Sequence, residues 1–256
     1  MSAAVKRVVV VGASSGLGRT IGTHLGSTGA QVALLARRQD RLVDAAKEAG
    51  NGALAIMCDV TDQASVESAI DEAAAGLGGI DSVVYSTGVG PLVKLTDLDA
   101  TTLRDAFATN VTGAHLVTQA ALPHLKDSNG VQVYLSSVIG SHTDPWPGLA
   151  AYAVTKAALE RLIQAWRNEH PDVGFTRLTV GDTGGGSGDN QTEFNAGWDR
   201  SALGELYPIW SARNYISGTL FDVTELLRVI DMLVGLGASA NIPTLVIQPR
   251  QPQAVQ

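Results

Sequence analysis

A tyrosine and a lysine, Tyr152 and Lys156, stand four residues apart near the start of a predicted helix over residues 150–169. Positions four apart share one face of a helix, so the two side chains are predicted to project side by side. A neighbouring ammonium ion favours the phenolate and lowers the pKa of a phenol. Such a tyrosine could donate and accept a proton near neutral pH. Pairs of this spacing also occur as ordinary surface contacts, so the rest of the chain decides between the two interpretations.

A second group of residues suits a bound phosphate. Gly12, Gly16 and Gly18 follow an apolar β-branched run, residues 7–11, and lead into a predicted helix over residues 17–27. Glycine lets a backbone approach a ligand closely, and a helix start offers free N–H groups and the positive end of a dipole. The spacing differs from the commonest dinucleotide fingerprint, and a plain strand-to-helix turn would use the same glycines.

Two arginines, Arg37 and Arg38, directly follow the predicted second strand, residues 31–36. In βαβ units the end of this strand lies beside the adenosine ribose. An acid there would hold the ribose 2′-hydroxyl, whereas guanidinium groups suit a 2′-phosphate, so the sequence predicts NADP(H), with NAD(H) second. The alternative is that the arginines only begin a solvated helix. Asp59, after the third strand, could accept a hydrogen bond from an adenine amine or serve as a loop acid.

The elements that would position these residues alternate regularly along the chain. Strands are predicted at 7–11, 31–36, 53–57, 81–86, 131–135, 174–180 and 243–248, and helices at 17–27, 40–49, 61 or 62 to 77, 101–122, 150–169 and 222–234. This alternation predicts an α/β fold, with a doubly wound parallel sheet of about seven strands and helices on both faces. Without a repeat or a linker, residues 1–256 are predicted to form a single domain.

Composition narrows the class of protein. The 256 residues are 45% hydrophobic and 17% charged, which is typical of a globular chain, and the net charge of −7 argues against a nucleic-acid surface. One cysteine, Cys58, excludes an intrachain disulfide and fits a reducing compartment. No long apolar run or signal-peptide pattern opens the sequence, so we expect a cytoplasmic protein without membrane contact. The histidines show no metal-ligand spacing, so no catalytic metal is expected.

Residues 182–218 differ from the rest of the chain. The segment opens with a glycine-rich stretch and then carries Trp198, Tyr207 and Trp210. A long insertion beside a ligand site can be a lid, and an Ω-loop packed on itself is the alternative. Together with Trp146, these aromatic residues suggest a partly apolar pocket for a hydrophobic or cyclic carbonyl compound.

Taken in order, these motifs resemble those of the short-chain dehydrogenases/reductases, over residues 5–248. The matching residues are Gly12, Gly16, Gly18, Asp59, Val60, Thr109, Asn110, Val111, Ser136, Ser137, Tyr152 and Lys156. The resemblance implies a single-domain Rossmann fold, usually of seven strands, assembled as a homodimer or homotetramer.

The resemblance also implies roles. Tyr152 would be the general acid or base, and Ser137 would hydrogen-bond the substrate oxygen. Lys156 would bind the nicotinamide ribose and lower the Tyr152 pKa, and Asn110 would hold a water in the proton relay. Arg37 corresponds to the basic residue that marks NADP preference. The implied cofactor-binding residues are Gly12, Ser14, Ser15, Gly16, Leu17, Gly18, Arg37, Arg38, Asp59, Val60, Gly88, Tyr152 and Lys156.

Three departures from the family pattern affect the substrate side. The spacing from Ser137 to Tyr152 is longer than usual, because of extra residues within 141–147, and Ser136 is the fallback if the register differs. The asparagines expected after the fourth strand are replaced by residues 85–87, and the proline-glycine after the sixth strand by residues 180–182.

Two functions remain open at this point. The first is an NADP(H)-dependent oxidoreductase that interconverts an alcohol and a carbonyl compound. The second is a non-catalytic NADP(H)-binding redox sensor that acts through a protein partner. Retention of both Tyr152 and Lys156 favours the enzyme.

Overall fold

The computed structural model describes residues 6–184 and 192–250 and contains one seven-stranded parallel sheet. Its strands are β1 Arg7–Val11, β2 Gln31–Ala36, β3 Leu54–Met57, β4 Ser82–Tyr85, β5 Val131–Ser137, β6 Gly174–Val180 and β7 Thr244–Ile247, in the spatial order 3-2-1-4-5-6-7. This is the doubly wound, Rossmann-like fold that the alternating pattern predicts. The order reverses between β1 and β4, and ligands of such sheets bind at that point, outside the carboxyl ends of the strands.

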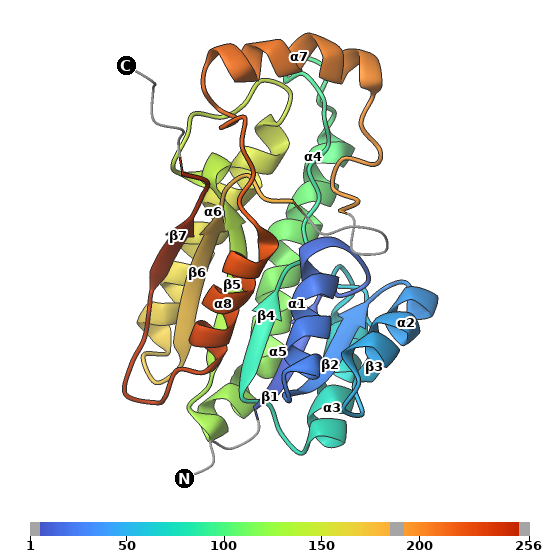
Figure 1. Cartoon of the computed structure of the whole chain (residues 1–256), viewed down its shortest axis with the longest axis vertical. Coiled ribbons are helices and arrows are strands. Elements are labelled where there is room, and N and C mark those ends of the chain that lie inside the picture. Colours follow the sequence, from blue (N-terminus) through green and yellow to red (C-terminus); the bar gives the residue numbers. More distant parts are fainter. Residues whose placement is uncertain (1–5, 185–191, 251–256) are drawn as a thin grey trace.

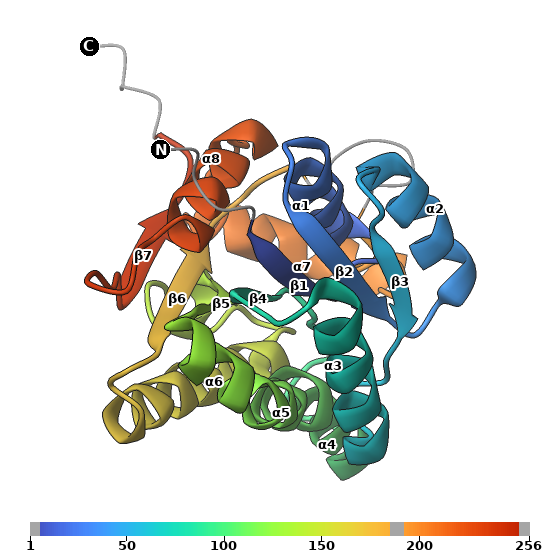
Figure 2. The same cartoon turned by 90° about the horizontal axis from the view of Figure 1, so that it is seen from below.

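Apart from α7, the helices form two layers, one on each face of the sheet (Figure 2). Their bounds are α1 Gly16–Ser27, α2 Gln39–Ala49, α3 Gln63–Leu77, α4 Ala100–Phe107, α5 Gly113–Ser128, α6 Ala150–Glu169, α7 Arg200–Ala212 and α8 Val223–Val234. Helices α1, α2 and α8 bury their apolar residues with one face of the sheet, and α3, α5 and α6 with the other. Because both faces are covered, β1, β2 and β4 are buried along nearly their whole length instead of alternating between buried and exposed residues.

The helix predicted over residues 101–122 is longer and is interrupted. It begins at Ala100, passes through a π-helical turn at Ala108–Thr112 (η1), and runs past Pro123 to Ser128. The predicted helix ended at Leu122, next to Pro123, which lacks an N–H donor. The structure keeps the helix going because α5 is packed on the sheet, where Gly113 lets it approach closely: a Cβ there would lie 2.8 Å from the Tyr85 hydroxyl.

Helix α7 lies within the segment for which no regular element was predicted, and residues 185–191 of that segment lie outside the described residues. Asp199 begins α7 by accepting a hydrogen bond from the Ala202 N–H, at 2.8 Å. In Figure 1 the helix lies across the top of the molecule, beyond the carboxyl ends of the strands. It packs there through Leu206 and Trp210, each at most 3% exposed.

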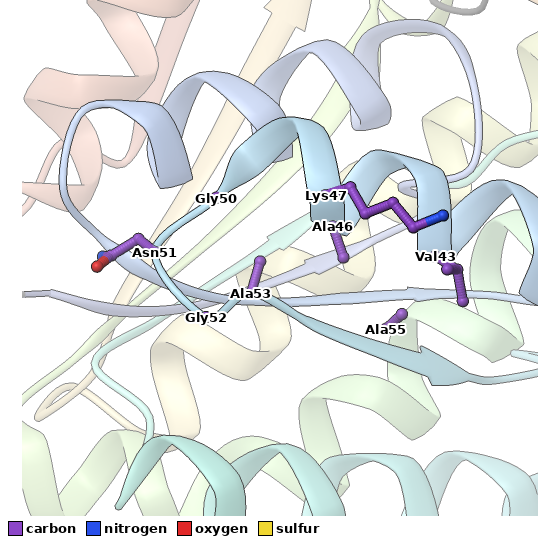
Figure 3. A pocket seen from close by; sticks show the side chains of 8 residues that line it. All are labelled: Val43, Ala46, Lys47, Gly50, Asn51, Gly52, Ala53 and Ala55. Carbon is purple, nitrogen blue, oxygen red and sulfur yellow. The ribbon is translucent and has the colours of Figure 1, made fainter.

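A shallow hollow of about 420 Å³ lies between α2 and the edge strand β3 (Figure 3). It is lined by Val43, Ala46, Lys47, Gly50, Asn51, Gly52, Ala53 and Ala55. Lys47 brings the only ionisable group to this lining, and none of the predicted site residues belongs to it. Ligands of open parallel sheets bind instead at the carboxyl ends of the strands.

Candidate active site

Tyr152 and Lys156 lie in the first two turns of α6, on one face, as their spacing predicts. The Lys156 ammonium nitrogen is 5.6 Å from the centre of the Tyr152 ring. Lys156 is only 3% exposed, and its Nζ donates a hydrogen bond to the Leu135 carbonyl oxygen at 2.8 Å. An ammonium group has three donors, so this bond fixes its position and leaves donors for a ligand.

The pKa of Tyr152 moves in the direction opposite to the sequence expectation. Burial raises the pKa of Tyr152 to about 12, and a hydrogen bond with Ser137 opposes this only in part. Burial also lowers the pKa of Lys156 to about 8, against the attraction of the Glu160 carboxylate. The expectation considered the ion pair alone. Burial disfavours the charged forms of both groups, the phenolate and the ammonium ion, so in the free protein Lys156 has the pKa closer to neutrality.

Ser137 and Ser136 end β5 and point to opposite sides, because side chains alternate along a strand. Ser137 reaches Tyr152, and its Oγ also accepts the Ile139 N–H at the start of a short 3-10 turn, Val138–Gly140. Ser136 donates to the buried Glu160 carboxylate at 3.3 Å. Of the two serines considered from the sequence, Ser137 therefore meets Tyr152, whereas Ser136 points to the other side of the strand and binds Glu160.

Asn110 sits in the π-helical turn η1 and is fully buried. Its Oδ1 accepts the Val89 N–H at 2.8 Å, and its Nδ2 donates to the Val89 carbonyl and to Thr155 Oγ1, both at 2.8 Å. Asn110 therefore ties the loop after β4 to α6. Gly88 lies between the groups of this site: a Cβ on it would be 3.6 Å from both Asn110 Oδ1 and Lys156 Nζ.

The glycine-rich turn after β1 has room for no larger residues. Gly12 has a φ of +91°, and a Cβ on Gly18 would lie 2.2 Å from the Gly12 carbonyl oxygen. Within the described residues, Ser15 forms no side-chain cap on α1, so the first N–H groups of this helix are open to an anion. The Thr87 hydroxyl beside Gly12 is buried with no partner among the same residues. The backbone donors and this unpaired hydroxyl fit a dinucleotide pyrophosphate.

Of the two arginines after β2, Arg38 is the one that faces this turn. Its Nη2 donates to Ser14 Oγ at 2.8 Å and to Ser15 Oγ at 2.9 Å. Arg37 is exposed, and its charge acts on Asp59. Arg38 also forms an ion pair with Glu193, which in turn binds Arg41 of α2. Arg41 and Glu193 were not predicted from the sequence. The signal that could have pointed to Arg41 is its position three residues after Arg38.

Asp59 and Val60 take local roles in this structure. Asp59 Oδ1 accepts the N–H and the hydroxyl of Thr61 at 2.9 and 2.8 Å, and the Thr61 backbone hydrogen bond is the main cause that lowers the pKa of Asp59. Val60 is buried against Gly113. These contacts fit the loop-acid interpretation of Asp59. Leu17, another predicted cofactor-binding residue, lies in the first turn of α1 and packs against the hydrophobic core.

The residues that depart from the family pattern form structural ties. The Tyr85 hydroxyl donates to the Thr109 carbonyl at 2.6 Å, and Ser86 Oγ donates to the Val11 carbonyl at 2.6 Å. Asp182 Oδ2 accepts the N–H and hydroxyl of Ser217, at 2.8 and 2.9 Å, and so joins the two ends of the insertion. The extra residues before α6 hold α7, because the Pro147 carbonyl accepts the Trp210 indole N–H at 2.8 Å.

An aromatic cluster surrounds Tyr152 on the side away from the sheet. Its members are Ile139, Leu149, Ala153, Leu206 and Trp210, with Leu92, Trp146, Tyr152, Trp198, Leu203, Tyr215 and Ile216 packed against them. Phe194, which the sequence analysis did not single out, meets the Tyr152 ring edge-on at a centroid distance of 4.8 Å. Tyr207, predicted with the aromatic group, is instead 52% exposed.

Residues 6–184 and 192–250 contain no group of three or more His, Cys, Asp or Glu side chains that could hold a metal ion. Within those ranges, no helix has the length and hydropathy that crossing a bilayer requires.

Comparison with known proteins defines the class. Residues 6–193 match the model of the short chain dehydrogenase family. The chain is 34% identical over 184 residues to 11-beta-hydroxysteroid dehydrogenase-like 3 of Arabidopsis thaliana, a match that covers 69% of this chain and 58% of the relative. It is 34% identical over 176 residues to an uncharacterized oxidoreductase of Staphylococcus epidermidis, covering 68% and 76% of the two chains.

Solved structures agree with this class. A short-chain type dehydrogenase/reductase from Mycobacterium marinum superposes with a TM-score of 0.80 at 26% identity, covering 95% of this chain and 94% of that one. An alcohol dehydrogenase from Thermococcus sibiricus, complexed with 5-hydroxy-NADP, has the same fold, with a TM-score of 0.78 at 24% identity over 95% and 96% of the two chains. The chain belongs to the short-chain dehydrogenase/reductase family. It is an oxidoreductase of that type, and the family uses NAD(P)(H) on small molecules.

Proposed function

We propose that the protein interconverts an alcohol and a ketone or aldehyde, with NADP(H) preferred over NAD(H) and Tyr152 as the acid and base. The observation that carries this proposal is the meeting of Ser137, Tyr152 and Lys156 at the carboxyl ends of the strands, beside the glycine-rich turn. Three donors converge there from two different elements, β5 and α6.

The chemistry follows from where charge develops. The nicotinamide, when bound, supplies or accepts the hydride. During reduction, negative charge grows on the substrate carbonyl oxygen, and hydroxyl donors aimed at that oxygen stabilise it. Ser137 and Tyr152 would be those donors, and Tyr152 would pass its proton to the oxygen. The Lys156 ammonium lies near the phenol and favours the phenolate that remains, while Asn110 holds the backbone of Val89 and the side chain of Thr155 in position.

The cofactor preference is argued from the arginines. Arg38 is held beside Ser14 and Ser15, next to the glycine-rich turn that would bind the nucleotide. Arg41 lies close to Arg38, since both guanidinium groups pair with the Glu193 carboxylate. Guanidinium groups bind phosphate through paired, charge-assisted hydrogen bonds.

The remaining expectations form part of the same proposal. The chain acts as one catalytic unit, and the described parts of the insertion, residues 182–184 and 192–218, cover the substrate side. Support comes from the cluster that joins Trp198 and Trp210 to Tyr152. The resemblance and the single buried cysteine, Cys58, support a homodimer or homotetramer in a cytoplasmic compartment.

The decisive experiment measures NADPH and NADH oxidation at several pH values with a panel of apolar ketones and aldehydes. We expect turnover with NADPH, weaker turnover with NADH, and loss of at least about a hundredfold in kcat for Tyr152→Phe, which removes the proton donor. Tyr207→Phe, an exposed tyrosine on α7, is the matched control and should retain activity. Binding of NADPH without turnover of any carbonyl compound would instead support the redox sensor.

A further inference from the structure

Residues 192–198 lie over the carboxyl edge of the sheet and touch both halves of the proposed cofactor site. Thr192 covers the glycine-rich turn, since a Cβ on Gly16 would lie 3.3 Å from the Thr192 Cα. Phe194 packs against Gly90 and meets the Tyr152 ring. Trp198 closes the contact by donating its indole N–H to the Gly90 carbonyl at 2.7 Å. We call residues 192–198 the latch.

Glu193 is the charged residue of the latch, and it binds the arginines of the phosphate site. One carboxylate oxygen pairs with Arg38 and the other with Arg41. Partial burial acts against ionisation of Glu193, but the hydrogen bonds from both guanidinium groups outweigh it and lower the pKa of its carboxyl. Glu193 therefore carries a negative charge at the place where a 2′-phosphate would present its own.

We propose that Glu193 holds the latch closed over the cofactor site, and that the 2′-phosphate of NADP(H) replaces Glu193 on Arg38 and Arg41 when the latch opens. This inference rests on the proposed NADP(H) function, and it identifies Glu193 as a residue that sets cofactor affinity. Both the phosphate and the carboxylate bind the same donors, so they exclude each other.

Opening the latch costs both cofactors the same free energy, but only NADPH replaces the ion pairs that are lost. Any dinucleotide that lies along the glycine-rich turn must displace Thr192 and Phe194, so NADPH and NADH bear the same free-energy cost of opening. Only NADPH supplies a new anion to the two arginines, whereas NADH leaves them without the carboxylate they have lost. Opening also withdraws Phe194 from Tyr152, so the cofactor must bind before a substrate can reach the phenol.

The test compares wild type with Glu193→Gln, which keeps the shape of the side chain and removes its charge. Two partly exposed ion pairs are lost, so we expect NADPH to bind about three- to tenfold more tightly, and NADH by a similar factor. Affinities are measured by cofactor fluorescence titration at low and moderate salt. Glu225→Gln is the matched control, since it removes the same charge from an exposed ion pair with Arg228 on α8, and it should leave both affinities unchanged.

Each other outcome overturns a definite part of the proposal. Equal or weaker NADPH binding by Glu193→Gln, with normal binding by wild type, would mean that Glu193 does not compete with the phosphate. Tightening of NADPH alone would mean that the latch leaves the dinucleotide path open. Failure of the folded wild type to bind either cofactor would remove the proposed function itself, and the latch with it. A circular-dichroism spectrum of each variant separates these results from misfolding.

Discussion

At the scale of single residues, burial decides the electrostatics of the site more than charge pairing does. Tyr152 lies near the Lys156 ammonium, yet its pKa is raised to about 12, while burial lowers the pKa of Lys156 to about 8. The phenol is therefore protonated in the free protein, which is the form that reduction of a carbonyl compound needs. The lysine changes charge within the physiological range, so we expect it to set the alkaline limit of activity.

This expectation can be measured in the pH dependence of kcat/KM, which reports the ionisations of the free enzyme. Below pH 8 Lys156 is charged, and it loses its charge as pH rises through its lowered pKa of about 8, so the reductive rate should fall there. Lys156→Met should reduce the rate at neutral pH and abolish that limb of the profile. Persistence of the limb in the variant would assign it to another group.

At the scale of elements, the π-helical turn η1 is what brings Asn110 to the site. An α-helix continued through residues 108–112 would place its side chains at different angles, and single π turns are frequent at functional sites. The turn directs the Asn110 amide at Val89 and Thr155, so that three elements meet at one side chain: the turn itself, the loop after β4, and α6. The asparagine is therefore a structural tie between these elements.

Replacing Asn110 with alanine should therefore lower stability as well as activity. The partly buried N–H and carbonyl of Val89 and the buried Thr155 hydroxyl would lose a partner, and we expect a loss of roughly 2–4 kcal/mol in the free energy of unfolding. Urea denaturation followed by circular dichroism measures this change. Thr112→Ala, an exposed position in the same turn, should change stability by no more than about 0.5 kcal/mol. Equal midpoints for the two variants would show that the tie is unimportant.

At the scale of the whole molecule, a largely buried ion pair joins the sheet to α6. Arg177 of β6 pairs with Glu160 of α6, whose side chains are 15% and 7% exposed. Glu160 also accepts hydrogen bonds from Ser136 and Ser141 at 3.3 and 3.1 Å. The pair lies one turn beyond Lys156, so it fixes α6 against the carboxyl half of the sheet and at the same time supports the charge of the lysine.

Removing one partner of this pair should be more harmful than removing both. Arg177→Met leaves a buried, unpaired carboxylate, and we expect it to cost roughly 3 kcal/mol in the free energy of unfolding. The double variant Arg177→Met/Glu160→Gln should recover most of that loss, because the uncompensated charge is gone. A double-mutant cycle from urea unfolding tests this. Additive losses would show that Glu160 and Arg177 stabilise the protein independently of each other.

The sequence alone determined the fold and much of the site. Apolar β-branched runs alternating with helical segments specify a parallel sheet covered on both faces, and the bounds of β2, α6 and β6 agree with the structure to the residue. The pairing of Tyr152 with Lys156 follows from helical geometry. These features depend on residues close together in the chain, whose relative positions the local backbone fixes.

Only the tertiary structure decided the rest, because it depends on residues far apart in the chain. The pKa of Tyr152 is set by the side chains that bury it, Phe194 among them, and the choice of Arg38 over Arg37 by which of them meets Ser14. The contact of Glu193 with Arg38 joins positions 155 residues apart, a distance over which neither periodicity nor a local motif carries information. Tertiary packing brings these groups together, and the burial and hydrogen bonds that result shift the pKa values of Tyr152 and Glu193.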